Sequence, residues 1–236
     1  MKALKTLAIA VASASALIAS SAHALTPSDL PADFDVNFSG ASAVDVLFRE
    51  LFQASGTGSI CVPGTLAQFT DNTAVPGGSY TAYFCNVSEA TVNLDLSSPA
   101  DGDKTDTHKV LFRKRSAGGS GQGVTPLLGA VQPTITHLQV TAAACATSLG
   151  TVSGAPAWTC AGTVNLKSDA GVSDVEPALL NANGNKLTSI TPLFANTFGV
   201  AATVKLRNAL QAAQGLTVGS DDVSQMPSLS RDQIAS

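Results

Sequence analysis

The sequence predicts an α/β protein with a mostly parallel sheet flanked by helices, together with disulfide-tied loop and β insertions. Strand-like runs alternate with helix-like runs along the chain, which is the pattern of α/β folds. Three of the strand-like runs end in short turns of Ser, Gly and Ala. Four cysteines lie in two stretches rich in turn residues. With 236 residues, of which 44% are hydrophobic, the chain can bury a sizeable core.

The amino end has the three parts of a secretory signal. Lys2 and Lys5 precede an uncharged run rich in Ala, Leu, Ile and Val, and Ala22-His23-Ala24 is a small-x-small cleavage site. The alternative, a retained membrane anchor, is disfavoured because the run is short and diluted with Ala and Ser. We therefore expect residues 1–24 to be a signal peptide, residues 25–236 to be periplasmic or secreted, and no membrane insertion after cleavage.

Charge disfavours nucleic acid as a partner. The net charge is −4 at pH 7, and it becomes more negative once the signal lysines are removed. A polyanion partner would need a basic stripe, and the one basic cluster is the segment Lys109–Arg115. We interpret that segment as the solvated face of a strand.

The cysteines predict two local disulfides. Export makes pairing favourable, and of the three possible connectivities we expect Cys61 with Cys85 and Cys145 with Cys160, because each pair closes a modest loop. Zinc is the rival interpretation, but there is no Cys-x-x-Cys and the histidines lie at no ligand spacing. We therefore expect no metal site.

An acidic loop carries Asp101, Asp103 and Asp106. Calcium is a possible ligand of such a loop, but the spacing lacks the rest of a calcium-binding loop. We expect a solvated turn.

Hydrophobic periodicity and turn residues place the remaining elements. Between the expected helices and strands, residues 56–106 should hold loops and short strands such as Ser79–Cys85, and residues 132–167 an irregular insertion tied by the second cysteine pair. The expected strands are residues 36–38, 108–115 and 194–204, and the expected helices are 43–53, 124–131, a capped start at 173–180, 205–214 and a start at 227–234.

Three turns share one character: each follows a strand, consists of small residues and opens a helix. They are Ser39–Ser42, Gly118–Gly123 and Gly171–Asp174. Helix amino ends present unsatisfied N–H groups, and glycine lets an oxyanion approach them closely. Because open α/β sheets gather such turns at the carboxyl ends of their strands, we expect the three to converge on one anion.

In their order along the chain, these motifs resemble phosphate-type substrate-binding proteins of ABC transporters, which have a periplasmic-binding-protein-like fold. Ser39-Gly40-Ala41-Ser42, Gly119-Ser120-Gly121-Gln122-Gly123 and Gly171-Val172-Ser173-Asp174 match the ligand turns of that family. Phe198-Gly199-Val200-Ala201 resembles its crossover strand, and residues 227–234 its threshold helix. Family members carry Thr-Gly-Ala-Gly where this chain has Ser-Gly-Ala-Ser.

The resemblance implies a ligand site for phosphate or a similar oxyanion. Its backbone and hydroxyl donors would come from the turns, with Asp174 accepting a hydrogen bond from a protonated oxygen, so that fully ionised sulfate is repelled. The implied ligand-binding residues are Gly40, Ala41, Ser42, Gly119, Ser120, Gly121, Ser173 and Asp174.

The resemblance also implies a lobe that hands its ligand to an ABC permease, without a cofactor or catalytic residues. Relatives continue into a second lobe, so we expect residues 25–236 to be the first lobe and the start of the crossover, either of a fragment or of a reduced relative. The alternative function is a secreted structural or interaction protein that keeps the fold without a ligand site. A serine hydrolase is disfavoured because Gln122 stands where a nucleophile elbow requires Gly.

Overall fold

The computed structural model describes residues 23–53, 58–71, 78–128, 131–176, 180, 187, 190–191 and 203–230. Most of the expected signal, residues 177–179 of the expected helix start and most of the expected strand 194–204 lie outside these residues. Residues 173–176, the described beginning of that helix start, are not helical. The chain divides into two compact units, Met1–Ile190 and Thr191–Ser236.

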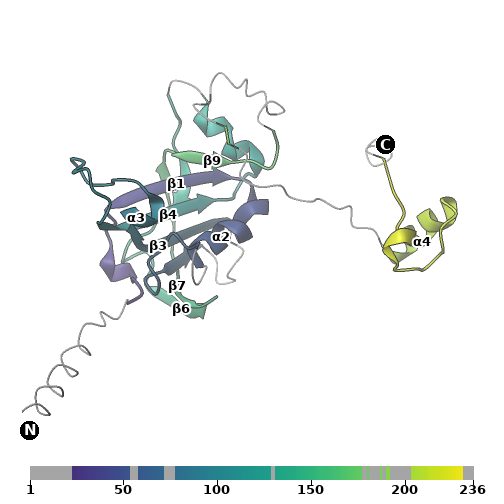
Figure 1. The fold of residues 1–236 in the computed structure, drawn as a ribbon, viewed down its shortest axis with the longest axis horizontal. Helices are drawn as coiled ribbons and strands as arrows, with labels where there is room; N and C mark the ends of the chain where they lie inside the picture. Colours follow the sequence, from purple (N-terminus) through teal and green to yellow (C-terminus); the bar gives the residue numbers. More distant parts are fainter. Residues whose placement is uncertain are drawn as a thin grey trace, which may run out of the picture. The chain divides into compact units, whose positions relative to one another are not determined.

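The first unit is a mixed α/β structure built on a seven-stranded sheet (Figure 1). The strands run in the order β6-β7-β2-β3-β4-β1-β9, and β5 and β8 form a separate two-stranded sheet. The strands are β1 (Phe34–Gly40), β2 (Ala67–Thr70), β3 (Tyr80–Ser88), β4 (Thr107–Arg115), β5 (Ile135–Leu138), β6 (Thr147–Val152), β7 (Ala155–Thr159), β8 (Thr163–Leu166) and β9 (Ala170–Val172). The helices of this unit are η1 (Pro27–Asp29), η2 (Ser42–Val44), α2 (Asp45–Gln53), α3 (Glu89–Val92), η3 (Ser120–Gly123) and η4 (Thr125–Leu127).

The large sheet is mixed rather than mostly parallel. Parallel pairs join β1 to β4, β1 to β9 and β2 to β7, whereas β2–β3, β3–β4 and β6–β7 are antiparallel. The pairs β2–β3 and β3–β4 arise because β2 and β3, from the stretch expected to hold loops and short strands, enter the sheet next to β4, whereas β6 and β7 form a hairpin. The group β4-β1-β9 and the pair β2–β7 keep the parallel arrangement that the sequence predicted.

The segment 132–167 is ordered, so the prediction of an irregular insertion was wrong. It contains β5 to β8, and β7 joins the large sheet in parallel beside β2, pairing Phe69 with Trp158. The expected helix at 124–131 is reduced in the described residues to the 3-10 turn η4, with Pro126 in its first turn as predicted.

Both faces of the sheet are covered by apolar side chains. On one face α2 packs against β3 and β4, with Phe52 stacked 4.5 Å from Tyr83 and 4.8 Å from Phe112, measured between ring centroids. On the other face the β5 residue Leu138 packs in a cluster with Phe84 and Leu111. The side chains of β3 and β4 therefore alternate between two buried layers.

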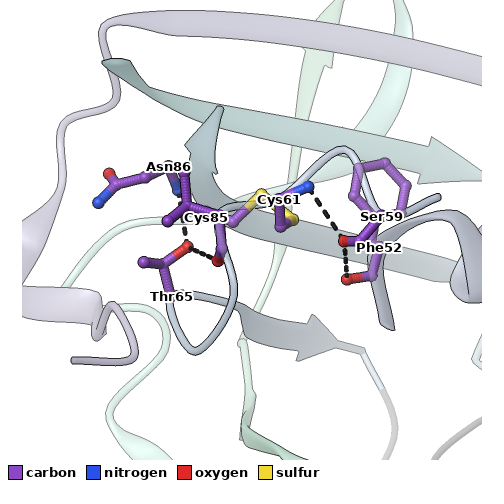
Figure 2. Close-up of a disulfide and its surroundings, with 7 residues drawn as sticks. Phe52, Ser59, Cys61, Thr65, Cys85 and Asn86 are labelled. Atoms are coloured by element: carbon purple, nitrogen blue, oxygen red, sulfur yellow. Dashed lines mark hydrogen bonds between the residues drawn. A yellow bond between two sulfur atoms is a disulfide. The ribbon is translucent and has the colours of Figure 1, made fainter. Parts of the chain in front are cut away.

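Both predicted disulfides are present. The Cys61–Cys85 bond joins the loop after α2 to β3, and the Cys145–Cys160 bond spans the hairpin of β6 and β7. Figure 2 shows how the first bond is supported: Thr65 accepts a hydrogen bond from the Asn86 amide at 3.2 Å. These loops are thus fixed covalently to the sheet.

The second unit consists of α4 (Val204–Ala213), the 3-10 turn η7 (Val223–Gln225) and the chain around them. Thr203 caps α4, accepting from the Leu206 amide at 3.2 Å, and the predicted helix 205–214 is confirmed within one residue. Buried Gln211 donates to the carbonyls of Ser220 and Gln225, at 2.9 Å each. The described part of the expected helix start, residues 227–230, is not helical.

Candidate functional site

The three small-residue turns meet at one edge of the sheet, as predicted. β1 lies between β4 and β9 and is parallel to both, so the carboxyl ends of all three strands point the same way (Figure 1). Residues 39–42 follow the end of β1, residues 116–123 follow β4, and residues 173–174 follow β9.

Glycines let the turns approach within backbone contact. A Cβ on Gly40 would lie 1.9 Å from the Val172 carbonyl oxygen and 2.7 Å from the Gly123 Cα. A Cβ on Gly171 would lie 1.8 Å from the Gly123 carbonyl oxygen. Such separations are impossible for real side chains, so these glycines are required by the contact between the turns themselves.

Hydrogen bonds complete the contact between the turns. Ser39 Oγ donates to the Gln122 carbonyl at 2.6 Å, and the Ala41 amide donates to the Val172 carbonyl at 2.8 Å. The Ala41 amide, which the resemblance assigns to a ligand, is therefore engaged within the protein. This part of the backbone serves to join β1 to β9.

The side chains at the surface of this edge are Ser42, Ser120 and Asp174. Ser120 Oγ donates to the Asp174 carboxylate, which links the turn after β4 to the turn after β9. Ser42 is exposed, and its hydroxyl has no hydrogen-bond partner among the residues that the structure describes. Hydroxyl donors and a carboxylate acceptor thus lie at the ends of neighbouring strands.

The other implied ligand residues have local roles. The Ser173 hydroxyl donates to the Val175 carbonyl at 2.5 Å and accepts from the Val175 amide. The Gly119 amide donates to the Ser116 carbonyl at 3.2 Å, and the Gly121 carbonyl accepts from the Val124 amide at 3.2 Å. These bonds shape the two turns around Ser120 and Asp174.

A buried lysine lies directly beneath the first turn, in a segment for which the sequence predicted a solvated strand face. Lys114 is 2% exposed, and its Nζ donates to the Gly40 and Ala41 carbonyls at 3.2 and 3.1 Å. It also contacts Asp45 Oδ1 at 3.2 Å, and Ser116 Oγ donates to both oxygens of the same carboxylate. Burial lowers the pKa of Lys114, and Asp45 opposes that shift.

The prediction that Lys109–Arg115 forms a solvated strand face was wrong. Lys114 faces α2, and Arg113 is 7% exposed and bonds to Asp35 and Asn37 at 3.1 and 3.3 Å. The reason is that β4 is central in the sheet and both of its faces are covered. Alternation alone does not reveal this arrangement, because a charged side chain can be buried with partners on either face.

The face opposite α2 holds a second buried polar group, which β5 supplies. His137 is fully buried, with Nε2 3.3 Å from Ser168 Oγ, and its Nδ1 has no partner among the described residues. Burial and the nearby charges of Arg113 and Arg115 lower the pKa of His137 to about 4. The imidazole is therefore neutral at pH 7.

Comparisons with known proteins give no family for this chain. No protein-family model, no curated protein and no solved structure matches it. Within the described residues, no helix has both the length and the apolar character needed to cross a bilayer. The two disulfides are consistent with an exported protein.

Proposed function

We propose that this chain is an exported binding protein that holds phosphate or a similar protonated oxyanion at the carboxyl edge of β4, β1 and β9, and delivers it to an ABC-type permease. The observation that carries the proposal is the strand order. β1 lies between β4 and β9 in the sheet. After β1, the chain therefore forms β4 on one side of it and later β9 on its other side. Ligands of open α/β sheets bind at such switch points.

The side chains at this edge suit a protonated anion. Ser42 and Ser120 offer hydroxyl donors, and Asp174 offers an acceptor. A carboxylate next to the ligand favours an anion that retains a proton, because a fully ionised one would be repelled. Ser120 donates to Asp174, and we expect a bound oxyanion to replace that contact with one hydrogen bond to each residue.

Lys114 supplies a buried positive charge next to the proposed site. Lys114 lies under the turn that carries Gly40 and Ala41 and polarises both carbonyl groups. Its ion pair with Asp45 offsets much of its charge, so we expect the lysine to position the turn rather than attract the anion.

Isothermal titration of the full chain with phosphate, and separately with sulfate, tests the proposal. We expect phosphate to bind with a Kd of about 1 mM or below. Ser120→Ala should weaken binding by about tenfold, and Asp174→Asn should reduce the preference for phosphate over sulfate. Asp101→Asn, an exposed carboxylate in another loop, is the matched control and should bind like wild type.

A second function is favoured by two observations, the occupied amide of Ala41 and the close glycine contacts around Val172. Turns packed in this way also suit a secreted structural or interaction protein with no ligand site. Such a protein would give no heat with either anion, and that result would refute the binding proposal.

A further inference from the structure

We propose that Glu89, Asp106 and His108 bind one divalent transition-metal ion, zinc above all, at the end of the sheet opposite the three turns. One ligand atom from each of the three side chains lies within 4.8 Å of the other two. β4 separates this group from the turns, since Thr107 is its first residue and Arg115 its last. Eight steps of about 3.3 Å along a strand make the separation roughly 26 Å. The inference is therefore independent of the proposed oxyanion site.

The antiparallel register of β3 and β4 brings the three residues together. Val87 pairs with His108 and Ser88 with Thr107. One step further, the Glu89 amide donates to the Asp106 carbonyl at 3.0 Å. Residues that are distant along the chain thus become neighbours at the open end of this pair of strands.

The spacing is close to that of a metal site. His108 Nε2 lies 3.0 Å from Glu89 Oε1. Ligands bound to zinc at about 2.0–2.1 Å with tetrahedral angles lie about 3.3 Å apart. Two of the three atoms are therefore near the required separation, and Asp106, which is exposed, can approach by a side-chain rotation.

Glu89 supplies the second observation that points to an ion. Its side chain is fully buried, and its Oε2 has no hydrogen-bond partner among the described residues. A buried carboxylate oxygen without a partner is costly. The other oxygen, Oε1, accepts from the Leu96 amide and lies against His108 Nε2. An ion bound through both oxygens of this carboxylate would satisfy Oε2.

The donor set favours zinc over calcium. Calcium prefers oxygen ligands alone, whereas one imidazole with two carboxylates suits zinc and its neighbours in the first transition row. The other loop acids are used by the loop itself: Asp95 accepts from the Ser97 and Gly102 amides at 3.0 and 2.8 Å, and Asp103 accepts from the Thr105 amide at 3.0 Å. Three protein ligands leave a fourth position for water.

Titration of the full chain with zinc chloride, followed by calorimetry and by equilibrium dialysis, tests the inference. We expect one zinc ion per chain and a higher Tm with zinc present, because the ion binds only the folded site. Asp106→Asn and His108→Gln should each weaken zinc binding by at least about tenfold. Both residues are at least partly exposed, so these variants should fold, whereas Glu89→Gln changes a buried group.

A matched control replaces an aspartate outside the group. Asp101→Asn alters an exposed side chain and should bind zinc as wild type does. The inference fails if wild type binds no zinc, if His108→Gln leaves binding unchanged, or if calcium binds as tightly as zinc. Since phosphate binding is measured without metal, either proposal can fail while the other stands.

Discussion

Replacing Gly40 with alanine should strongly destabilise the first unit. Gly40 adopts φ +125°, a backbone conformation that side chains disfavour, and its added Cβ would lie 1.9 Å from the Val172 carbonyl oxygen. That carbonyl also accepts the hydrogen bond from the Ala41 amide at 2.8 Å. The substitution therefore imposes backbone strain and displaces a buried hydrogen bond at the same time.

The two costs can be estimated separately. A sparsely populated backbone conformation costs about 1–3 kcal/mol. Loss of a buried hydrogen bond costs a further 1–3 kcal/mol, approximately. We expect the free energy of unfolding to fall by about 4 kcal/mol, against the total of about 5–15 kcal/mol that is usual for a domain. For a unit of this size the Tm should fall by about 8–16 °C.

Urea unfolding monitored by Trp158 fluorescence measures this change. Trp158 is the only tryptophan of the sequence and packs against Phe69 in the first unit, so it reports on the unit that contains Gly40. Gly121→Ala is the control, because its added Cβ meets nothing within 4 Å. A loss below about 1 kcal/mol in Gly40→Ala, or an equal loss in Gly121→Ala, would refute the reasoning.

Three further changes follow from buried groups. Lys114→Met should lower the free energy of unfolding in urea by about 3 kcal/mol, because it leaves Asp45 and two carbonyls without their cation. A variant as stable as wild type would contradict this. Replacing Cys145 and Cys160 with serine should lower the free energy of unfolding by about 3 kcal/mol, since their bond closes a 15-residue loop. An unchanged Tm would contradict this prediction. Because the folded pKa of His137 is about 4, below its unfolded value, only the unfolded state gains a proton as the pH falls from 7 to 5. Stability should then fall by roughly 2 kcal/mol over this range, and His137→Gln should lose that part of the pH dependence.

The local sequence pattern was enough to predict the turns and the two disulfides. Ser39–Ser42 and Gly171–Asp174 stand out because small residues follow apolar strands, and parallel strands bring such ends together. The helix 43–53 follows from apolar residues at helical spacing, and α2 ends at Gln53 as predicted. The cysteine pairs follow from the short loops that they close.

Contacts between distant segments could not be predicted in this way. The place of β7 beside β2 depends on pairing Phe69 with Trp158, which are far apart in sequence and carry no local signal for each other. Lys114 resembles a surface residue until its Asp45 and carbonyl partners are known. The approach of Glu89 to His108 depends on the register of a hairpin with a long loop.

The positions of the two disulfides have a consequence for how the molecule responds to reducing agents. Their cysteines lie in β3 and in segments around β2, β6 and β7, and none lies in β4, β1 or β9. Thiols should therefore loosen one flank of the sheet first, while the edge with the glycine contacts depends on its own non-covalent bonds.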